Sequence, residues 1–228
     1  MLSRLDEKRI AEAVEKAERA TSGEIVCALS NEASSYREVP LAWAAAIALG
    51  APPIALAFGA DPLRLSMGAG AWLAAQGASL QSQIAMALGA FAVTQIVLFA
   101  LVALFVAIPP IRRIATPRAL KRHRVARAAH HQFAAIAAHA KQSETGVLIF
   151  VALADRQVQI LADAAIHQRC GENPWREAAA SIARAMKGGA DPTSGIVRAI
   201  EICGAALAEH FPSSGRPGER FSAKPLEV

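Results

Sequence analysis

Two apolar runs make up the stretch GVLIFVALADRQVQIL, residues 146–161, and a short polar step at 155–157 separates them. Runs of this length, rich in Val, Ile and Leu, predict two buried strands at about 146–153 and 157–162. The step between them is too short for the crossover that parallel strands need. We therefore expect the two strands to pair antiparallel.

A third buried strand is predicted far away in the sequence, by the apolar run EIVCALS at 24–30. One strand cannot exist alone, because its backbone groups need hydrogen-bonding partners and its apolar faces need cover. Its obvious partner is the pair at 146–162. We therefore expect residues 1–38 and 112–211 to be two parts of one α/β domain with a small mixed sheet, interrupted by an insertion at 39–111.

The predicted insertion is almost free of charge, since no Asp, Glu, Lys or Arg occurs at 39–60 or at 65–111. About 20 apolar residues in a helix span a bilayer, and the runs 84–108 and 41–60 are long enough. The run 41–60 contains Pro52-Pro53, which membrane helices tolerate where neighbouring groups compensate for the lost hydrogen bonds. Two spans return the chain to the side it left, whereas one or three would separate the two parts of the domain. The sequence thus predicts an inserted transmembrane hairpin of two helices.

Positive charge follows the predicted hairpin directly. Seven Lys and Arg residues lie between 112 and 127, whereas the segment 61–83 has one basic residue, Arg64. Because cytoplasmic flanks carry the excess of Lys and Arg, we expect a multi-pass protein of the bacterial inner (plasma) membrane with both termini in the cytoplasm. A nucleic-acid patch is the alternative for the basic run, but it lacks interleaved aromatic residues. A topology signal that also touches anionic headgroups explains its position.

In the charged parts of the chain, the spacing of apolar residues and the residues typical of helix ends predict four helices. The predicted helices cover residues 3–20, 116–142, 174–187 and 194–209. A tail at 212–228, rich in Gly, Pro and Ser, is expected to be flexible.

Cysteines and sequence motifs give no direct sign of catalysis. Cys27, Cys170 and Cys203 form no closely spaced pair, and Cys27 and Cys203 lie in apolar runs, so we expect buried free thiols. The sequence contains no GxSxG, P-loop, HExxH or dinucleotide-binding motif. No nucleophile with a neighbouring base is evident.

Several segments together resemble the TPM domain family, also called the TPM phosphatase domain. TGVLIFVALADRQVQILAD at 145–163 resembles the core motif of that family, and ERATSGEIVCALS at 18–30 resembles its first strand with the preceding helix. The layout, with Tyr36 before the first span, Trp175, and HFP at 210–212, is similar to the subgroup in which membrane helices interrupt the domain. The resemblance implies an α/β/α sandwich. Acid phosphatase activity has been attributed to one member of the family, and accessory functions or metal-ion binding to others, so the resemblance implies these as candidate functions. The C-terminal tail of this chain departs from the family's usual ending.

Polar residues at the predicted strand ends are the candidate site. Asp155 and Asp163 are candidate ligands for a divalent cation such as Ca²⁺ or Mg²⁺, and Glu24 is a third carboxylate near a strand end. Arg156 is a candidate for holding a phosphate oxygen. The alternative is that Asp155-Arg156 is ordinary polar turn chemistry.

Two functions follow as hypotheses. The preferred one is a non-enzymatic, membrane-anchored binding or accessory module that acts on a membrane protein partner and is tuned by a divalent cation. The alternative is a metal-assisted acid phosphatase. A transporter or channel is disfavoured, because two spans per chain form a pathway only through oligomerisation, and no nucleic-acid partner is expected.

Overall fold

The chain forms two compact units, which are described separately below. The computed structural model describes residues 3–32, 34–59, 79–139, 146–189, 191–213 and 225–227. The first unit combines Met1–Ser35 with Arg118–Val228, and the second is Tyr36–Pro117. The second unit contains the predicted insertion 39–111 and extends beyond it at both ends.

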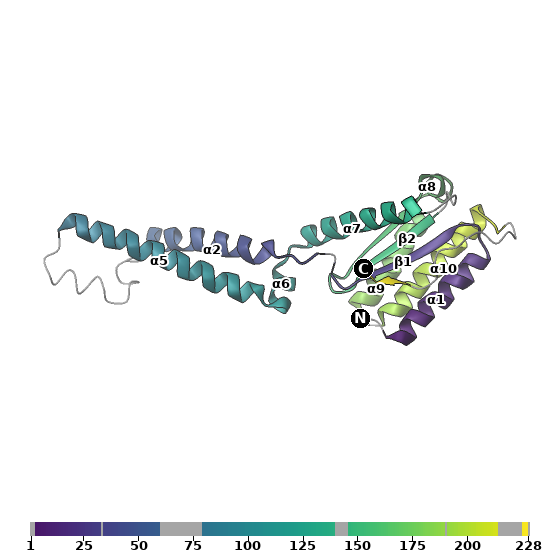
Figure 1. Ribbon diagram of the computed structural model, residues 1–228, viewed down its shortest axis with the longest axis horizontal. Coiled ribbons are helices and arrows are strands. Elements are labelled where there is room, and N and C mark those ends of the chain that lie inside the picture. Colours follow the sequence, from purple (N-terminus) through teal and green to yellow (C-terminus); the bar gives the residue numbers. More distant parts are fainter. Residues whose placement is uncertain are drawn as a thin grey trace. The chain divides into compact units, whose positions relative to one another are not determined.

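The first unit is built on a small mixed sheet with the strand order β3-β2-β1-β4 (Figure 1). β1 (Glu24–Ser30) pairs in parallel with β2 (Gly146–Ala152) along its whole length. β2 pairs antiparallel with β3 (Gln157–Ala162). The antiparallel pair is confirmed, and so is the joining of the strand at 24–30 to that pair. The two parts of the domain therefore form one sheet.

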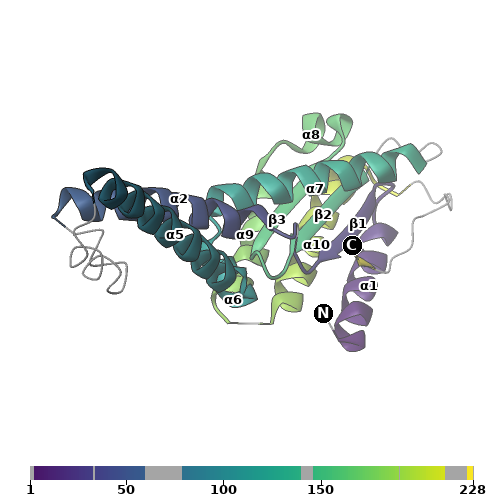
Figure 2. The ribbon, with the colours of Figure 1, turned by 60° about the vertical axis from the view of Figure 1, so that its left-hand side comes forward.

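Helices cover both faces of this sheet, because alternate residues of β1 and β2 point to opposite sides (Figures 1 and 2). On one face the core includes α1 (Arg4–Arg19), α9 (Asn173–Lys187) and α10 (Pro192–His210). On the other face α7 (Arg118–His139) packs against the sheet. The side chains from β1 and β2 in the first cluster are Ile25, Cys27, Leu29, Val147, Ile149 and Val151, and those in the second are Val26, Ala28, Leu148, Phe150 and Ala152.

Two glycines allow α10 to approach its neighbours closely. A Cβ atom added to Gly204 would lie 2.6 Å from the Cβ atom of Ala17 on α1. A Cβ atom added to Gly195 would lie 2.6 Å from the Cβ atom of Ala185 on α9. Both distances are too short for a real contact, so the helix layer is packed at a spacing that only glycine permits at these positions.

An ion pair also joins α1 to the start of α10. Arg9 Nη1 donates to Asp191 Oδ2 at 2.8 Å, and the Thr193 N–H donates to Asp191 Oδ1 at 3.0 Å as a helix cap. Partial desolvation of the Asp191 carboxylate favours its neutral form. The bonds from Arg9 and Thr193 outweigh that effect, and the pKa of Asp191 is lowered from its usual value.

Two short elements of the first unit differ from the sequence-based expectation. α8 (Ala164–Cys170) follows β3 and was not predicted. β4 (Leu226–Glu227) pairs in parallel with β1 at the edge of the sheet. The tail expected to be flexible therefore contributes a strand at its end, while residues 214–224 lie outside the described part of the chain.

The second unit contains a helical hairpin formed by α2 (Glu38–Ala57) and α5 (Leu80–Ala107), which pack against each other. α2 continues through Pro52 and Pro53. A short helix, α6 (Pro109–Ala115), follows α5, and Trp43 Nε1 of α2 donates to its Ala115 carbonyl oxygen at 3.1 Å. The segment predicted to connect the two spans on the outer side, 61–83, lies mostly outside the described residues.

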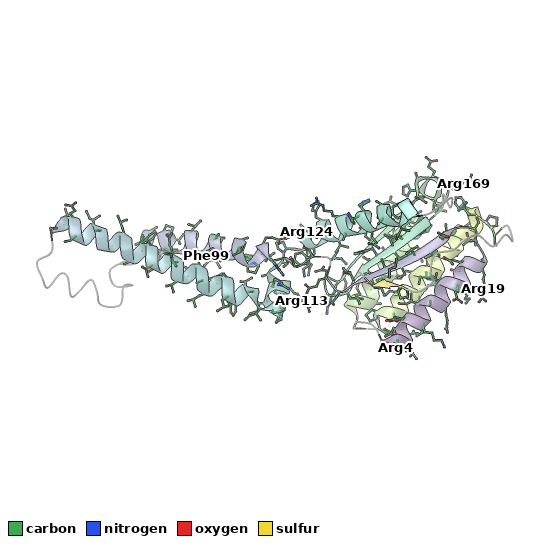
Figure 3. The ribbon with its side chains drawn as sticks, in the orientation of Figure 1. Arg4, Arg19, Phe99, Arg113, Arg124 and Arg169 are labelled. Atoms are coloured by element: carbon green, nitrogen blue, oxygen red, sulfur yellow. The ribbon has the colours of Figure 1, made fainter. Side chains whose placement is uncertain are left out.

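The hairpin exposes apolar side chains to an unusual degree. Among the described residues, every exposed large hydrophobic side chain except Leu5 and Leu226 belongs to the second unit. Phe99, labelled on α5 in Figure 3, is 38% exposed. In the most apolar 18-residue stretch of α5, only 6% of the residues are buried. By length and composition, α2 and α5 are two helices that are able to cross a membrane.

Candidate functional site

The carboxyl ends of β1 and β2 lie side by side and define one end of the sheet. Ser30 is opposite Ala152 in the parallel register. Beyond the strands the ladder continues, because the N–H of Leu153 donates to the Ser30 carbonyl at 2.9 Å and that of Ala154 to the Asn31 carbonyl at 2.8 Å. In open α/β sheets this is the end where ligands bind, since the loops that follow the strands converge there.

The β2–β3 turn at this end carries two of the predicted site residues. Asp155 is buried, with 5% of its surface exposed, whereas Arg156 is exposed. Arg156 has a φ of 51°, a left-handed conformation that is costly for a residue with a Cβ atom. Its N–H donates to the Leu153 carbonyl oxygen at 3.2 Å, which closes the turn. The turn therefore fixes the backbone at Arg156 and presents its guanidinium side chain to solvent.

Further polar groups at the same end come from the segment after β1 and from α7. Arg124 of α7, labelled in Figure 3, donates from Nη1 to Ser34 Oγ at 3.3 Å. The hydroxyl group of Ser30 donates to the Glu32 carbonyl oxygen at 2.9 Å. Residue types of this kind bind anions, since guanidinium groups and hydroxyl groups donate hydrogen bonds to carboxylate or phosphate oxygens. This carboxyl-end site comprises Ser30, Ser34, Arg124, Asp155 and Arg156.

The other two predicted site residues lie at the opposite end of the sheet. Glu24 begins β1 directly opposite Gly146. Asp163 follows β3, and its Oδ2 accepts a hydrogen bond from the Gly146 N–H at 2.8 Å. A third carboxylate at this end belongs to Glu18, whose Oε1 accepts from the Ile25 N–H at 3.1 Å. Asp163 and Glu18 thus satisfy backbone donors where the strands begin.

This arrangement does not fit the single cation site suggested by the sequence. The antiparallel turn sends β3 back along β2, so Asp155 and Asp163 are about 20 Å apart for a strand of this length. One cation needs ligands within about 2.6 Å of itself. Within the described parts of the chain, no group of three or more His, Cys, Asp and Glu side chains is arranged to hold a metal ion.

Two motifs quoted for the family resemblance meet at the amino end of β1. Thr21 Oγ1 donates to the Phe211 carbonyl oxygen at 2.7 Å and accepts from the Gly23 N–H at 3.0 Å. The Ser22 N–H also donates to the Phe211 carbonyl at 3.0 Å. The Arg169 guanidinium lies 5.0 Å from the centre of the Phe211 ring. These contacts tie the α1–β1 turn to the end of α10, which gives TSG and HFP a structural role.

The buried thiols are chemically quiet. Burial raises the pKa of Cys27 to about 12, and burial together with the neighbouring Cys27 raises the pKa of Cys203 to about 12. Both groups stay protonated at neutral pH, whereas nucleophilic and metal-binding cysteines act as thiolates. This agrees with the expectation of buried free thiols.

Comparison with known proteins supports the fold alone. No family model matches the chain, and no curated protein matches it. The structure is similar to the NMR structure of the BA42 protein from the psychrophilic bacterium Bizionia argentinensis, a TPM-like domain protein, with a TM-score of 0.55 and 18% sequence identity. The match covers 100% of this chain and 96% of that chain. At this identity the similarity concerns the fold only.

The sequence had indicated Asp155 and Arg156 at the carboxyl end but not their neighbours. Ser34 and Arg124 are 90 residues apart in the chain and come together only through the sheet and α7. The prediction of antiparallel β2 and β3 was the one signal that could have separated Asp155 from Asp163 beforehand, because an antiparallel strand returns the chain to the other end.

Proposed function

We propose that this protein is an integral protein of the bacterial inner membrane, in which a TPM-like α/β domain is anchored by the α2–α5 hairpin and serves as a binding or accessory module for a membrane protein partner. One observation carries the proposal. β1 precedes the hairpin in the chain and β2 follows it, yet the two strands pair in parallel, while the hairpin between them exposes apolar side chains.

The exposed side chains of the hairpin supply the physical reason for a membrane. Moving one fully exposed Leu, Ile or Phe side chain from water into an apolar medium is favourable by about 1.5–3 kcal/mol. On α5, residues such as Leu88, Ile96 and Leu104 are each more than half exposed. A bilayer covers such side chains on all sides of a helix, and it requires the internally satisfied backbone that a helix provides.

The sheet supplies the reason for two crossings. β1 precedes the hairpin and β2 follows it, and they share a continuous ladder. Both strands must therefore lie on the same side of any membrane, which an even number of crossings allows. The excess of Lys and Arg after the hairpin supports the cytoplasm as that side.

The carboxyl-end site supports the binding role. It combines the exposed Arg156 with the Arg124–Ser34 pair, and its residues flank the points where the chain leaves the first unit at Ser35 and returns at Arg118. A partner that binds there would have to come close to the root of the anchor, which favours a membrane protein with an acidic or phosphorylated surface segment.

Topology labelling in intact cells tests the proposal with the full chain. Single cysteines replace Lys16 on α1 and Glu177 on α9, both exposed, in a Cys170→Ser background, and a third replaces residue 70 between the spans. A membrane-impermeant maleimide should label position 70 in intact cells, and positions 16 and 177 only after lysis. Labelling of 16 and 177 on opposite sides of the membrane would contradict the proposal.

The phosphatase hypothesis has its own assay, because no arrangement at the site favours it. Purified full-length protein would be incubated with a phosphomonoester, with and without Mg²⁺ or Ca²⁺, beside the Asp155→Ala variant. We expect no turnover above background. Metal-dependent turnover that disappears in Asp155→Ala would replace the accessory role with an enzymatic one.

A further inference from the structure

The first half of α7 presents a strongly basic surface to solvent, called the basic face below. α7 contains no Asp or Glu in its 22 residues, whereas α1 balances its basic residues with acidic ones and forms ion pairs along the helix. The residues of this basic face, all exposed, are Arg118, Arg122, His123, Arg127 and His130. Val125 and Ala129 pack on the sheet, and this packing holds His123, Arg127 and His130 outward. Arg118 and Arg122 lie seven residues before Val125 and Ala129, on the same side of the helix, and are exposed at its start.

A pocket of about 340 Å³ opens beside this face, between α7 and β3. Arg122 and His123 line it from the helix, and Gln157 and Gln159 line it from the strand. The volume is within the range of small-ligand sites, roughly 300–1,000 Å³. A guanidinium group and two carboxamide groups around such a space can donate hydrogen bonds to phosphate and glycerol oxygens.

The position of α7 in the chain connects this surface with the anchor. Only Thr116 and Pro117 separate it from α6, and α6 follows α5 after one residue. Basic residues that immediately follow a membrane helix lie within reach of lipid headgroups, where each contributes about fivefold to the attraction towards an anionic surface. A water-soluble partner would not require the basic residues to follow the hairpin so closely in the chain.

We propose that the basic face of α7, with the α7–β3 pocket beside it, binds the headgroups of acidic phospholipids in the membrane that holds the hairpin. This inference rests on the proposed anchoring and adds a lipid class to it. Nucleic acid is the competing ligand for a basic face. It is disfavoured because no Phe, Tyr or Trp occurs between Arg118 and Gln132 to stack on bases.

The test uses the full chain in nanodiscs of phosphatidylcholine, with or without added phosphatidylglycerol. A fluorescent label at His130→Cys, in a Cys170→Ser background, reports how accessible this face is to a neutral, water-soluble quencher. Added phosphatidylglycerol should reduce quenching, and high salt should restore it because salt screens exposed charges. The variant R118Q/R122Q/R127Q should lose this response.

The matched control is R4Q/K16Q/R184Q, which removes the same three charges from exposed positions on α1 and α9. It should keep the full response. Equal responses of the two triple variants, or no response to phosphatidylglycerol in the otherwise unaltered chain, would overturn the inference. Shielding by a short nucleic-acid duplex but not by phosphatidylglycerol would also overturn it.

A second label separates this result from the anchoring itself. Phe99→Cys on α5, labelled in the same nanodiscs, should be quenched by nitroxide groups carried on lipid tails. Quenching at 99 without a lipid response at 130 would leave the anchor intact and refute the headgroup site. Absence of quenching at 99 would refute the anchor.

Discussion

Removing the hairpin should leave the first unit folded. Because Ser35 and Arg118 belong to the same unit, we expect that Tyr36–Pro117 can be replaced by a flexible Gly/Ser linker of about ten residues, whose ends lie on average about 17 Å apart. The resulting chain should be monomeric in water without detergent, because Leu5 and Leu226 are then the large hydrophobic side chains that stay exposed among those described.

The free energy of unfolding of this shortened chain should depend weakly on the linker. The loop that joins β1 to β2 would contain about 43 residues with a ten-residue linker and about 73 with a forty-residue linker, so the longer loop costs about 0.5 kcal/mol of closure entropy. Urea unfolding, monitored by circular dichroism, measures the difference. A loss of several kcal/mol on lengthening the linker would contradict the view that the connection between Ser35 and Arg118 affects the stability of the first unit only through loop closure.

Two core substitutions show whether β1 takes part in that fold. Ile25 on β1 and Ile149 on β2 are buried in the same cluster, with 2% and 0% of their surfaces exposed. Truncation of either to Ala in the shortened chain should lower the free energy of unfolding by about 2–5 kcal/mol. If Ile25→Ala has no effect while Ile149→Ala has its full effect, the parallel pairing is wrong.

Three smaller predictions concern the helix layer and the turn. Gly204→Val should destabilise the shortened chain by about 1–3 kcal/mol in urea unfolding, because α1 leaves no space for a side chain there. Asp191→Asn should cost at most about 1 kcal/mol at neutral pH, since its ion pair is about half exposed. The pKa of Asp191 is lowered in the folded state, so its contribution to the free energy of unfolding is complete above the unfolded pKa near 3.8. That contribution is lost as the pH falls through the lower folded pKa. The unfolding midpoints of the chains with and without Asp191→Asn should therefore converge at low pH. Arg156→Gly should raise the free energy of unfolding by about 1 kcal/mol by relieving the left-handed strain, and partner capture from solubilised membranes, compared with Arg156→Lys, should reveal whether the guanidinium group binds.

Much of the fold followed from periodicity and from the need to satisfy a strand. The run at 24–30 is too short and too apolar to be stable alone, and that requirement identified its partner across the insertion. α8 escaped prediction because seven residues hold too little periodicity for a helix signal. β4 escaped because two residues that complete an edge ladder carry no pattern of their own.

The candidate site was harder to predict from the sequence than the fold, and the reason is the topology of the sheet. Strand ends were identified correctly, but a list of strand ends does not say which of them share an edge of the sheet. Asp155 ends one strand and Asp163 ends the next, and antiparallel pairing sends them to opposite edges. The Arg124–Ser34 contact depends on the position of α7 over the sheet, which no local pattern encodes.

The hairpin also has a consequence for how β1 finds β2. A disordered connection between them would contain about 115 residues, and pairing of α2 with α5 shortens it effectively to roughly 50, which lowers the closure cost by about 0.7 kcal/mol. If the hairpin inserts into the membrane before β2 is synthesised, it holds the buried-type strand at 24–30 close to the point where β2 will emerge. Without that order, a seven-residue apolar strand would stay unpaired while more than a hundred residues were added, a state that favours aggregation. Under the proposed anchoring, early folding of the insertion would make the distant parallel pairing of β1 and β2 feasible, so the hairpin and the split sheet would depend on each other.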